Sequence, residues 1–141
     1  MHDVEIPFTD GNVSATVRVG DTVRRATRPW TPAAHALLLH LEAMEFNGAP
    51  RVLRFDPRGR ESLTFIPGET APASLDGYES DETLVGAARL LRRYHDAVRG
   101  FQPPSDARGR FTVGAPTTGE VICHNDVAAG TSPSSMISPR G

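Results

Sequence analysis

The residues best suited to chemistry form one polar run close to the end of the chain, Val121-Ile122-Cys123-His124-Asn125-Asp126. Its two apolar β-formers predict a buried strand that delivers the polar residues out of the core. This loop can be interpreted as a catalytic loop or as the plain end of a strand. Cys123 and His124 do not suggest a thiol nucleophile with its base, because adjacent strand residues point apart.

The composition is that of an ordinary globular domain. The chain has 141 residues, 38% hydrophobic content and a net charge of -2, which gives no electrostatic reason to expect nucleic acid or a membrane surface as a partner. All 15 basic residues are Arg, so a cation that grips phosphate must be Arg. No apolar run approaches the length of a membrane span, the N-terminus lacks signal-peptide features, and the single Cys fits a reducing cytoplasm. We therefore expect a cytoplasmic location.

The first half of the chain predicts strands around one helix. Thr31 is expected to cap the helix, with Pro32 at its first position and Asn47-Gly48 as its stop. Its apolar stripe is Leu37, Leu38, Leu41 and Met44. Alternating polarity and turn residues predict strands at 4–8, 13–19, 22–26, 51–56 and 61–66. The expected order is three strands, a helix and two strands.

The second half predicts a linker, a helix and a final short strand. Residues 67–79 are rich in Pro, Gly, Ala and Ser and indicate a hinge and linker. Ser80 or Asp81 is expected to cap the next helix, and Gly100 to end it. We expect its buried side to comprise Leu84, Ala88, Leu91, Tyr94, His95 and Val98. Residues 101–119 read as a loop, 120–123 as a strand, and the polar segment 129–141 as a disordered tail.

Six segments, in this order, resemble the aminoglycoside phosphotransferase family of kinase-like small-molecule phosphotransferases. They are Val19 to Arg25, His40-Leu41-Glu42, Gly48 to Arg51, Phe65 to Glu69, Leu90 to His95, and His124-Asn125-Asp126. The resemblance implies an α+β fold with a protein-kinase-like small lobe, a five-stranded antiparallel sheet plus one helix. An incomplete helical large lobe would follow. The nucleotide lobe would span 1–66, and the partial second lobe 80–128.

The resemblance also implies a site for ATP and Mg²⁺. Asp126 would act as the base and His124 would support its loop, while Arg24, partnered by Glu42, would position phosphates. The turn at Gly11 would cover the phosphates, and backbone groups at Phe65 and Ile66 would meet adenine. The alternatives without a binding role are a plain hairpin at Gly11, a surface charge at Arg24 and a solvated side chain at Glu42.

The pattern breaks after Asp126. Thr131 occupies the position of the metal-binding Asn, and the metal-binding Asp that should follow is missing, so no metal ligand is assigned. We expect transfer of the ATP γ-phosphate to a hydroxylated small molecule, impaired by C-terminal truncation, and self-association of a truncated chain. The alternative is a non-catalytic binding or immunity-type protein that retains the kinase-like nucleotide lobe.

Overall fold

The computed structural model describes residues 3–8, 15–68 and 80–108. The chain divides into two compact units, of which the first comprises Met1–Phe65 with Gln102–Thr117 and the second Ile66–Phe101 with Thr118–Gly141. The predicted lobe boundaries remain a prediction. The predicted catalytic-loop residues His124 and Asp126 lie outside the described residues, as do the turn at Gly11, Cys123 and Thr131.

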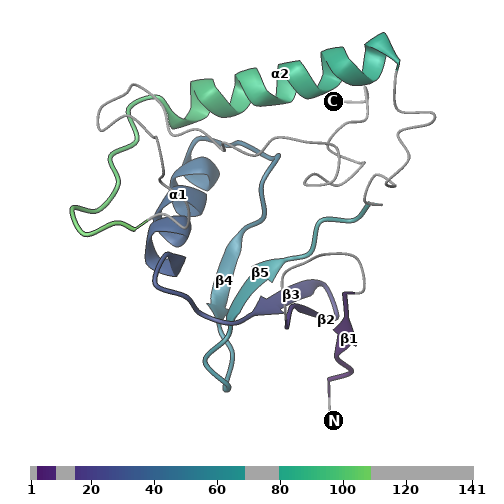
Figure 1. Ribbon diagram of the computed structural model, residues 1–141, viewed down its shortest axis with the longest axis vertical. Helices are drawn as coiled ribbons and strands as arrows, with labels where there is room; N and C mark the ends of the chain where they lie inside the picture. The colour runs from purple at the N-terminus through teal and green to yellow at the C-terminus, as the bar shows by residue number, and fades with distance from the viewer. Residues whose placement is uncertain (1–2, 9–14, 69–79, 109–141) are drawn as a thin grey trace. The chain divides into compact units, whose positions relative to one another are not determined.

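The first unit contains an antiparallel sheet of five short strands and one helix (Figure 1). The sheet order is β1-β2-β3-β5-β4, so β1 and β4 are its edges. The elements are β1 (Ile6–Pro7), β2 (Val17–Val19), β3 (Thr22–Arg25), α1 (Thr31–Ala43), β4 (Val52–Phe55) and β5 (Glu61–Thr64). The α+β class and the order of elements are as predicted, while each strand is shorter than its sequence pattern suggested.

Hydrogen-bonded registers fix which side chains share a face of the sheet. Val23 of β3 lies opposite Leu63 of β5, and Arg24 lies opposite Ser62. Because side chains alternate along a strand, Arg24 and Arg25 project to opposite faces. Among the described residues of this unit, the buried apolar ones are Val19, Leu41, Phe46 and Leu63.

Both ends of α1 differ from the sequence prediction. Trp30 is the N-cap residue and Thr31 is the first helical residue. The hydroxyl of buried Thr31 accepts a hydrogen bond from the N–H of Arg28 at 2.9 Å, so it bonds to the segment before the helix, and α1 has no side-chain cap hydrogen bond.

The C-terminal end of α1 comes before Asn47-Gly48. The N–H groups of Glu45 and Phe46 donate to the carbonyl oxygens of Glu42 and Leu41. Glu45 has φ 57°, so this Schellman motif places a non-glycine residue where glycine is usual. Burial of Phe46 and Leu41 supports the closure, because the two apolar residues occupy the positions that such a motif brings together.

The helix of the second unit, α2 (Asp81–Val98), begins as predicted. Ser80 is its N-cap, and its hydroxyl accepts a hydrogen bond from the N–H of Thr83 at 3.2 Å. The predicted buried side is wrong at its N-terminal end, because Leu84 is 70% exposed and Ala88 is also exposed. Burial is concentrated at the other end, at Ala97 and Val98. A helical apolar period therefore marked a stripe that is only partly covered.

Candidate functional site

The segment that joins β4 to β5 is organised by the carboxylate of Asp56. Asp56 Oδ1 accepts the N–H groups of Arg58 and Arg60, each at 2.9 Å, and Oδ2 accepts Arg60 Nε at 2.7 Å. Gly59, which lies between Arg58 and Arg60, has φ 74°, a backbone conformation that glycine adopts without strain and that allows the tight turn. An Asp side chain that bonds to backbone N–H groups ahead of it is typical of such turns.

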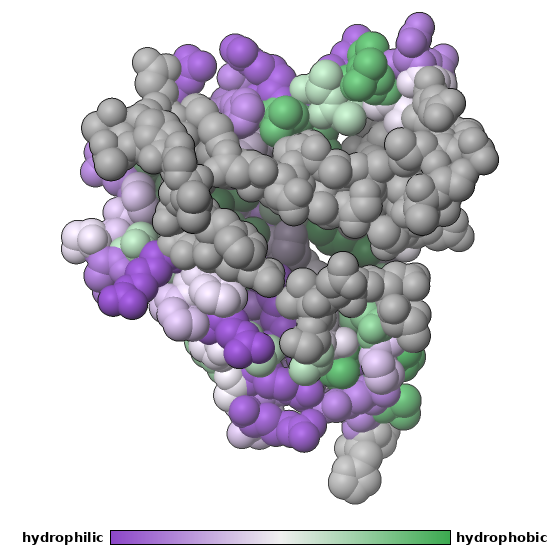
Figure 2. Space-filling model, viewed as in Figure 1, coloured by the Kyte–Doolittle hydropathy of each residue, from purple (hydrophilic) through white to green (hydrophobic). Residues whose placement is uncertain are grey.

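Glu5, just before β1, joins this turn from far away in the sequence. Its Oε1 lies 2.7 Å from Arg60 and 3.1 Å from Arg58. We call Glu5, Arg24, Asp56, Arg58 and Arg60 the Asp56 cluster. In Figure 2, hydrophilic residues cover the end of the sheet unit where Figure 1 places the β4–β5 turn. The cluster thus ties the N-terminal segment to the turn between the last two strands.

The cluster lowers the pKa of both carboxyl groups. The hydrogen bond from Arg60 is the main cause of the lowered pKa of Glu5. Burial opposes ionisation of Asp56, but the hydrogen bonds from Arg60 and Arg58 outweigh it, and the pKa of Asp56 is lowered. The same bonds, first to Glu5 and then to Asp56, raise the pKa of Arg60. All three groups are held in their charged forms.

Arg24 belongs to this cluster and does not pair with Glu42 in the described part of the chain. Its guanidinium lies 3.7 Å from Asp56 and 3.6 Å from Asp3. Its side chain is only 17% exposed, and its buried Nε has no hydrogen-bond partner among the described residues. Glu42 is exposed near the end of α1. The structure therefore does not bring the two predicted phosphate-positioning residues together.

A second group of charges lies around the buried carboxylate of Glu61, at the start of β5. Its Oε1 accepts Arg25 Nε from β3, and its Oε2 is hydrogen-bonded to His35 Nε2 from α1. The side chain of Glu61 is 3% exposed, and the His35 ring also lies against Phe55, with 5.5 Å between ring centroids. We call Glu61, Arg25 and His35 the Glu61 cluster. It joins α1 to the sheet.

The predicted adenine-binding stretch makes contacts within the sheet unit. The N–H of Phe65 donates to the carbonyl of Asp21 at 2.8 Å, so it is not free for a base. The ring of Phe65 stacks with Phe8 and lies 3.9 Å from the guanidinium carbon of Arg18. Ile66 is half-buried. A role of this stretch in nucleotide binding remains a prediction.

Several of the strongest contacts were not anticipated from the sequence. The Asp56–Arg60 spacing of four residues across Pro57 and Gly59 was a local signal for a closed turn. No local signal indicated Glu5 or His35, since each meets its partners across a long stretch of sequence. The described residues contain no group of three or more His, Cys, Asp or Glu side chains that could hold a metal ion. None of the described helices has the length and apolar character needed to cross a membrane.

Comparison with known proteins gives one informative similarity. The chain is 35% identical, over 92% of its length, to the trifolitoxin immunity protein of Rhizobium leguminosarum bv. trifolii. It spans about half of that relative, 54% of its length. No protein-family model and no solved structure matches the chain.

This similarity corrects the function expected from the sequence. The assignment to the aminoglycoside phosphotransferase family, and with it the expected phosphotransferase activity, is wrong, because the named relative is an immunity protein and no kinase family matches. The alternative, a non-catalytic immunity-type protein, agrees better with the similarity.

Proposed function

We propose that this chain is an immunity-type protein that protects cells from a toxin without transferring phosphate. The observation that carries the proposal is the 35% identity to the trifolitoxin immunity protein over 92% of this chain. Because the chain spans only about half of that relative, the relative's role is extended to this chain as a proposal. Protection would then come from binding, either of the toxin or of the component that the toxin attacks.

The charges of the sheet unit support a binding role. Arg24 and Arg25, the two cations of β3, already face carboxylates, at Asp56 and Glu61 respectively. A phosphate approaching either cation would have to compete with these neighbouring negative charges. The same pairs hold the turn and the helix in place, which suits a rigid binding scaffold.

We also propose that the sheet unit retains the arrangement of a kinase-like small lobe. The position of α1 between β3 and β4, and the sheet order β1-β2-β3-β5-β4, support this finer description of the fold. ATP and Mg²⁺ were the ligands expected of such a lobe from the sequence. Binding of ATP and Mg²⁺ stays a prediction, as does binding of a small hydroxylated molecule or of a second copy of the chain. The absence of nucleic-acid and membrane partners also stays a prediction.

The decisive experiment expresses the chain in a trifolitoxin-sensitive strain and measures growth over a range of trifolitoxin concentrations. We expect the inhibitory concentration to rise by about tenfold or more relative to cells with an empty vector, a shift equivalent to about 1.4 kcal/mol if protection tracks binding. The chain with Asp126→Asn is tested beside it. Equal protection by both is the expected result, because removal of a catalytic base does not disturb a binding role.

Two outcomes would contradict the proposal in different ways. No protection, with soluble chain confirmed in the cells, would show that this chain is not an immunity protein for that toxin. Protection that disappears with Asp126→Asn, while the variant keeps the wild-type circular dichroism spectrum, would show that the mechanism needs a base. Leu41→Asp, which places a charge in the core of the sheet unit, provides the unfolded control.

A further inference from the structure

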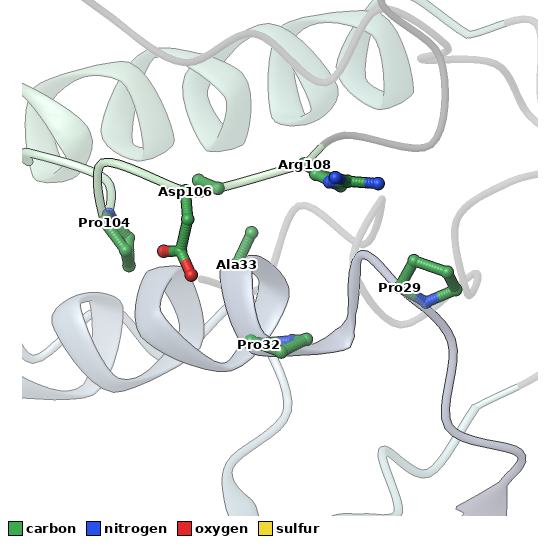
Figure 3. Close-up of a pocket in the computed structure, with 7 residues that line it drawn as sticks. Pro29, Pro32, Ala33, Pro104, Asp106 and Arg108 are labelled. Atoms are coloured by element: carbon green, nitrogen blue, oxygen red, sulfur yellow. The ribbon is translucent and has the colours of Figure 1, made fainter.

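A cavity of about 380 Å³ lies between the start of α1 and a segment that follows α2 in the sequence. Residues from 29–33 form one wall, and residues from 104–108 form the other (Figure 3). Both walls belong to the first unit. Its lining residues are Pro29, Pro32, Ala33, Pro104, Asp106, Ala107 and Arg108. A volume of this size lies in the range of small-ligand pockets.

Proline restricts the backbone in the apolar part of the lining. Three of the seven lining residues are proline, whose ring fixes the backbone φ angle. The N–H of Ala107 donates to the carbonyl of Pro104 at 2.9 Å, which closes a turn in the second wall. Walls of this kind lose little conformational entropy when a ligand binds, so weak contacts can produce measurable affinity.

The two charged residues of the lining are exposed and have no ion pair or hydrogen bond within residues 3–8, 15–68 and 80–108. In Figure 3 the Asp106 carboxylate extends toward α1, and the Arg108 side chain lies farther along the same wall of the pocket, away from Pro104. Several other charged groups of this unit do pair closely, as Glu5 does with Arg60. A free anion and a free cation are therefore presented together with an apolar surface.

We propose that this pocket binds a zwitterionic, peptide-like ligand with an apolar body, whose ammonium group meets Asp106 and whose carboxylate meets Arg108. Prolines and alanines accommodate the apolar body, and the guanidinium is suited to bidentate recognition of a carboxylate. A purely apolar ligand would leave both charges unused. A metal ion is a poor fit, because the lining offers one carboxylate as a ligand and a guanidinium that repels cations. The inference does not depend on the proposed immunity function.

The test uses the full chain and three forms of one dipeptide, Ala-Phe with free ends, N-acetyl-Ala-Phe and Ala-Phe amide. Titrations are followed by the NMR shifts of the backbone amides of Ala33 and Ala107, which lie on opposite walls. We expect the free dipeptide to bind in the millimolar range. Loss of either terminal charge should raise Kd by about two- to fivefold, the range of an exposed ion pair.

Two variants assign each charge to its partner. Asp106→Asn should abolish the preference for the free amine but keep the preference for the free carboxylate. Arg108→Gln should do the reverse. Asp21→Asn and Arg54→Gln remove matching exposed charges outside the pocket and should leave all Kd values unchanged. Equal binding of the three dipeptide forms, no shift at Ala33 and Ala107, or unchanged preferences in the variants would overturn the proposal.

Discussion

The β4–β5 hairpin and the proline-lined pocket use the same kinds of side chain in opposite ways. At the hairpin, Asp56 and Glu61 are almost fully buried and each meets two or more cationic or N–H groups. At the pocket, Asp106 and Arg108 are exposed and have no partner among the described residues. A buried carboxylate must be paired to be tolerated, whereas an exposed one needs no partner. The hairpin charges are thus committed to the fold, and the pocket charges are available for binding.

The largest expected effect comes from breaking the Glu61 cluster. Glu61→Ala removes the acceptor shared by Arg25 and His35 and should lower the free energy of unfolding by about 3 kcal/mol, the cost of leaving partners of a buried pair without their counter-charge. Because the Arg25 side chain is 44% exposed, water can solvate it in the variant, which limits the loss. Urea denaturation measures the change.

Glu42→Ala is the matched control for this variant. It removes an exposed carboxylate of α1 and should change the free energy of unfolding by no more than about 0.5 kcal/mol. A loss as large as that of Glu61→Ala would show that Glu42 has a structural partner, and would revive its predicted role beside the β3 cations.

The Asp56 cluster should make stability depend on pH in the acidic range. Glu5 and Asp56 have lowered pKa values in the folded chain, so the unfolded chain binds more protons as the pH falls. Their stabilising contribution is present above the unfolded pKa values of about 4 and is lost as the pH falls through the lower folded values. We expect the urea midpoint to decrease from about pH 5 to pH 3.

The variant Asp56→Asn tests the origin of this pH dependence. It keeps an oxygen that can accept the N–H groups of Arg58 and Arg60 but cannot ionise. Its stability should be lower than that of the wild type at pH 7, and the difference should shrink toward pH 3. A wild-type acid profile in this variant would exclude Asp56 as a source of the effect.

The features that the sequence predicted are those set by neighbouring residues. Alternating polarity located the first two strands, and the turn residues around the other three located those. Ser80 with its acidic first turn located the start of α2. The stop of α1 was misplaced, because Asn47-Gly48 is the stronger local signal but burial of Phe46 favours closure at Glu45 in a left-handed conformation. Leu84 fits the helical period of α2 and is nonetheless exposed.

The candidate sites were harder to predict because they depend on contacts between distant residues. Glu5 reaches Arg60 across 55 positions, and His35 reaches Glu61 across 26. The family resemblance predicted Glu42 as the partner of Arg24. In the structure the Arg24 guanidinium instead lies close to Asp56 and Asp3. The pocket was also missed, since segment 101–119 gave only the signals of a loop. The approach of residues 104–108 to residues 29–33 has no counterpart in local sequence.

The smallest expected effect is on stability at the pocket. Asp106→Asn and Arg108→Gln each remove an exposed charge without a partner in the described chain, so the free energy of unfolding should stay within about 0.5 kcal/mol of the wild-type value. The acid profile should keep its wild-type slope, because the Asp56 cluster is intact in both variants. Urea denaturation at pH 7 and pH 4 measures both quantities. A clear loss of stability in either variant would mean that the pocket charges support the fold, and the contrast with the hairpin would fail. Unchanged stability together with altered dipeptide preference would separate binding from folding at this surface, because the same substitution would then alter one property and leave the other intact.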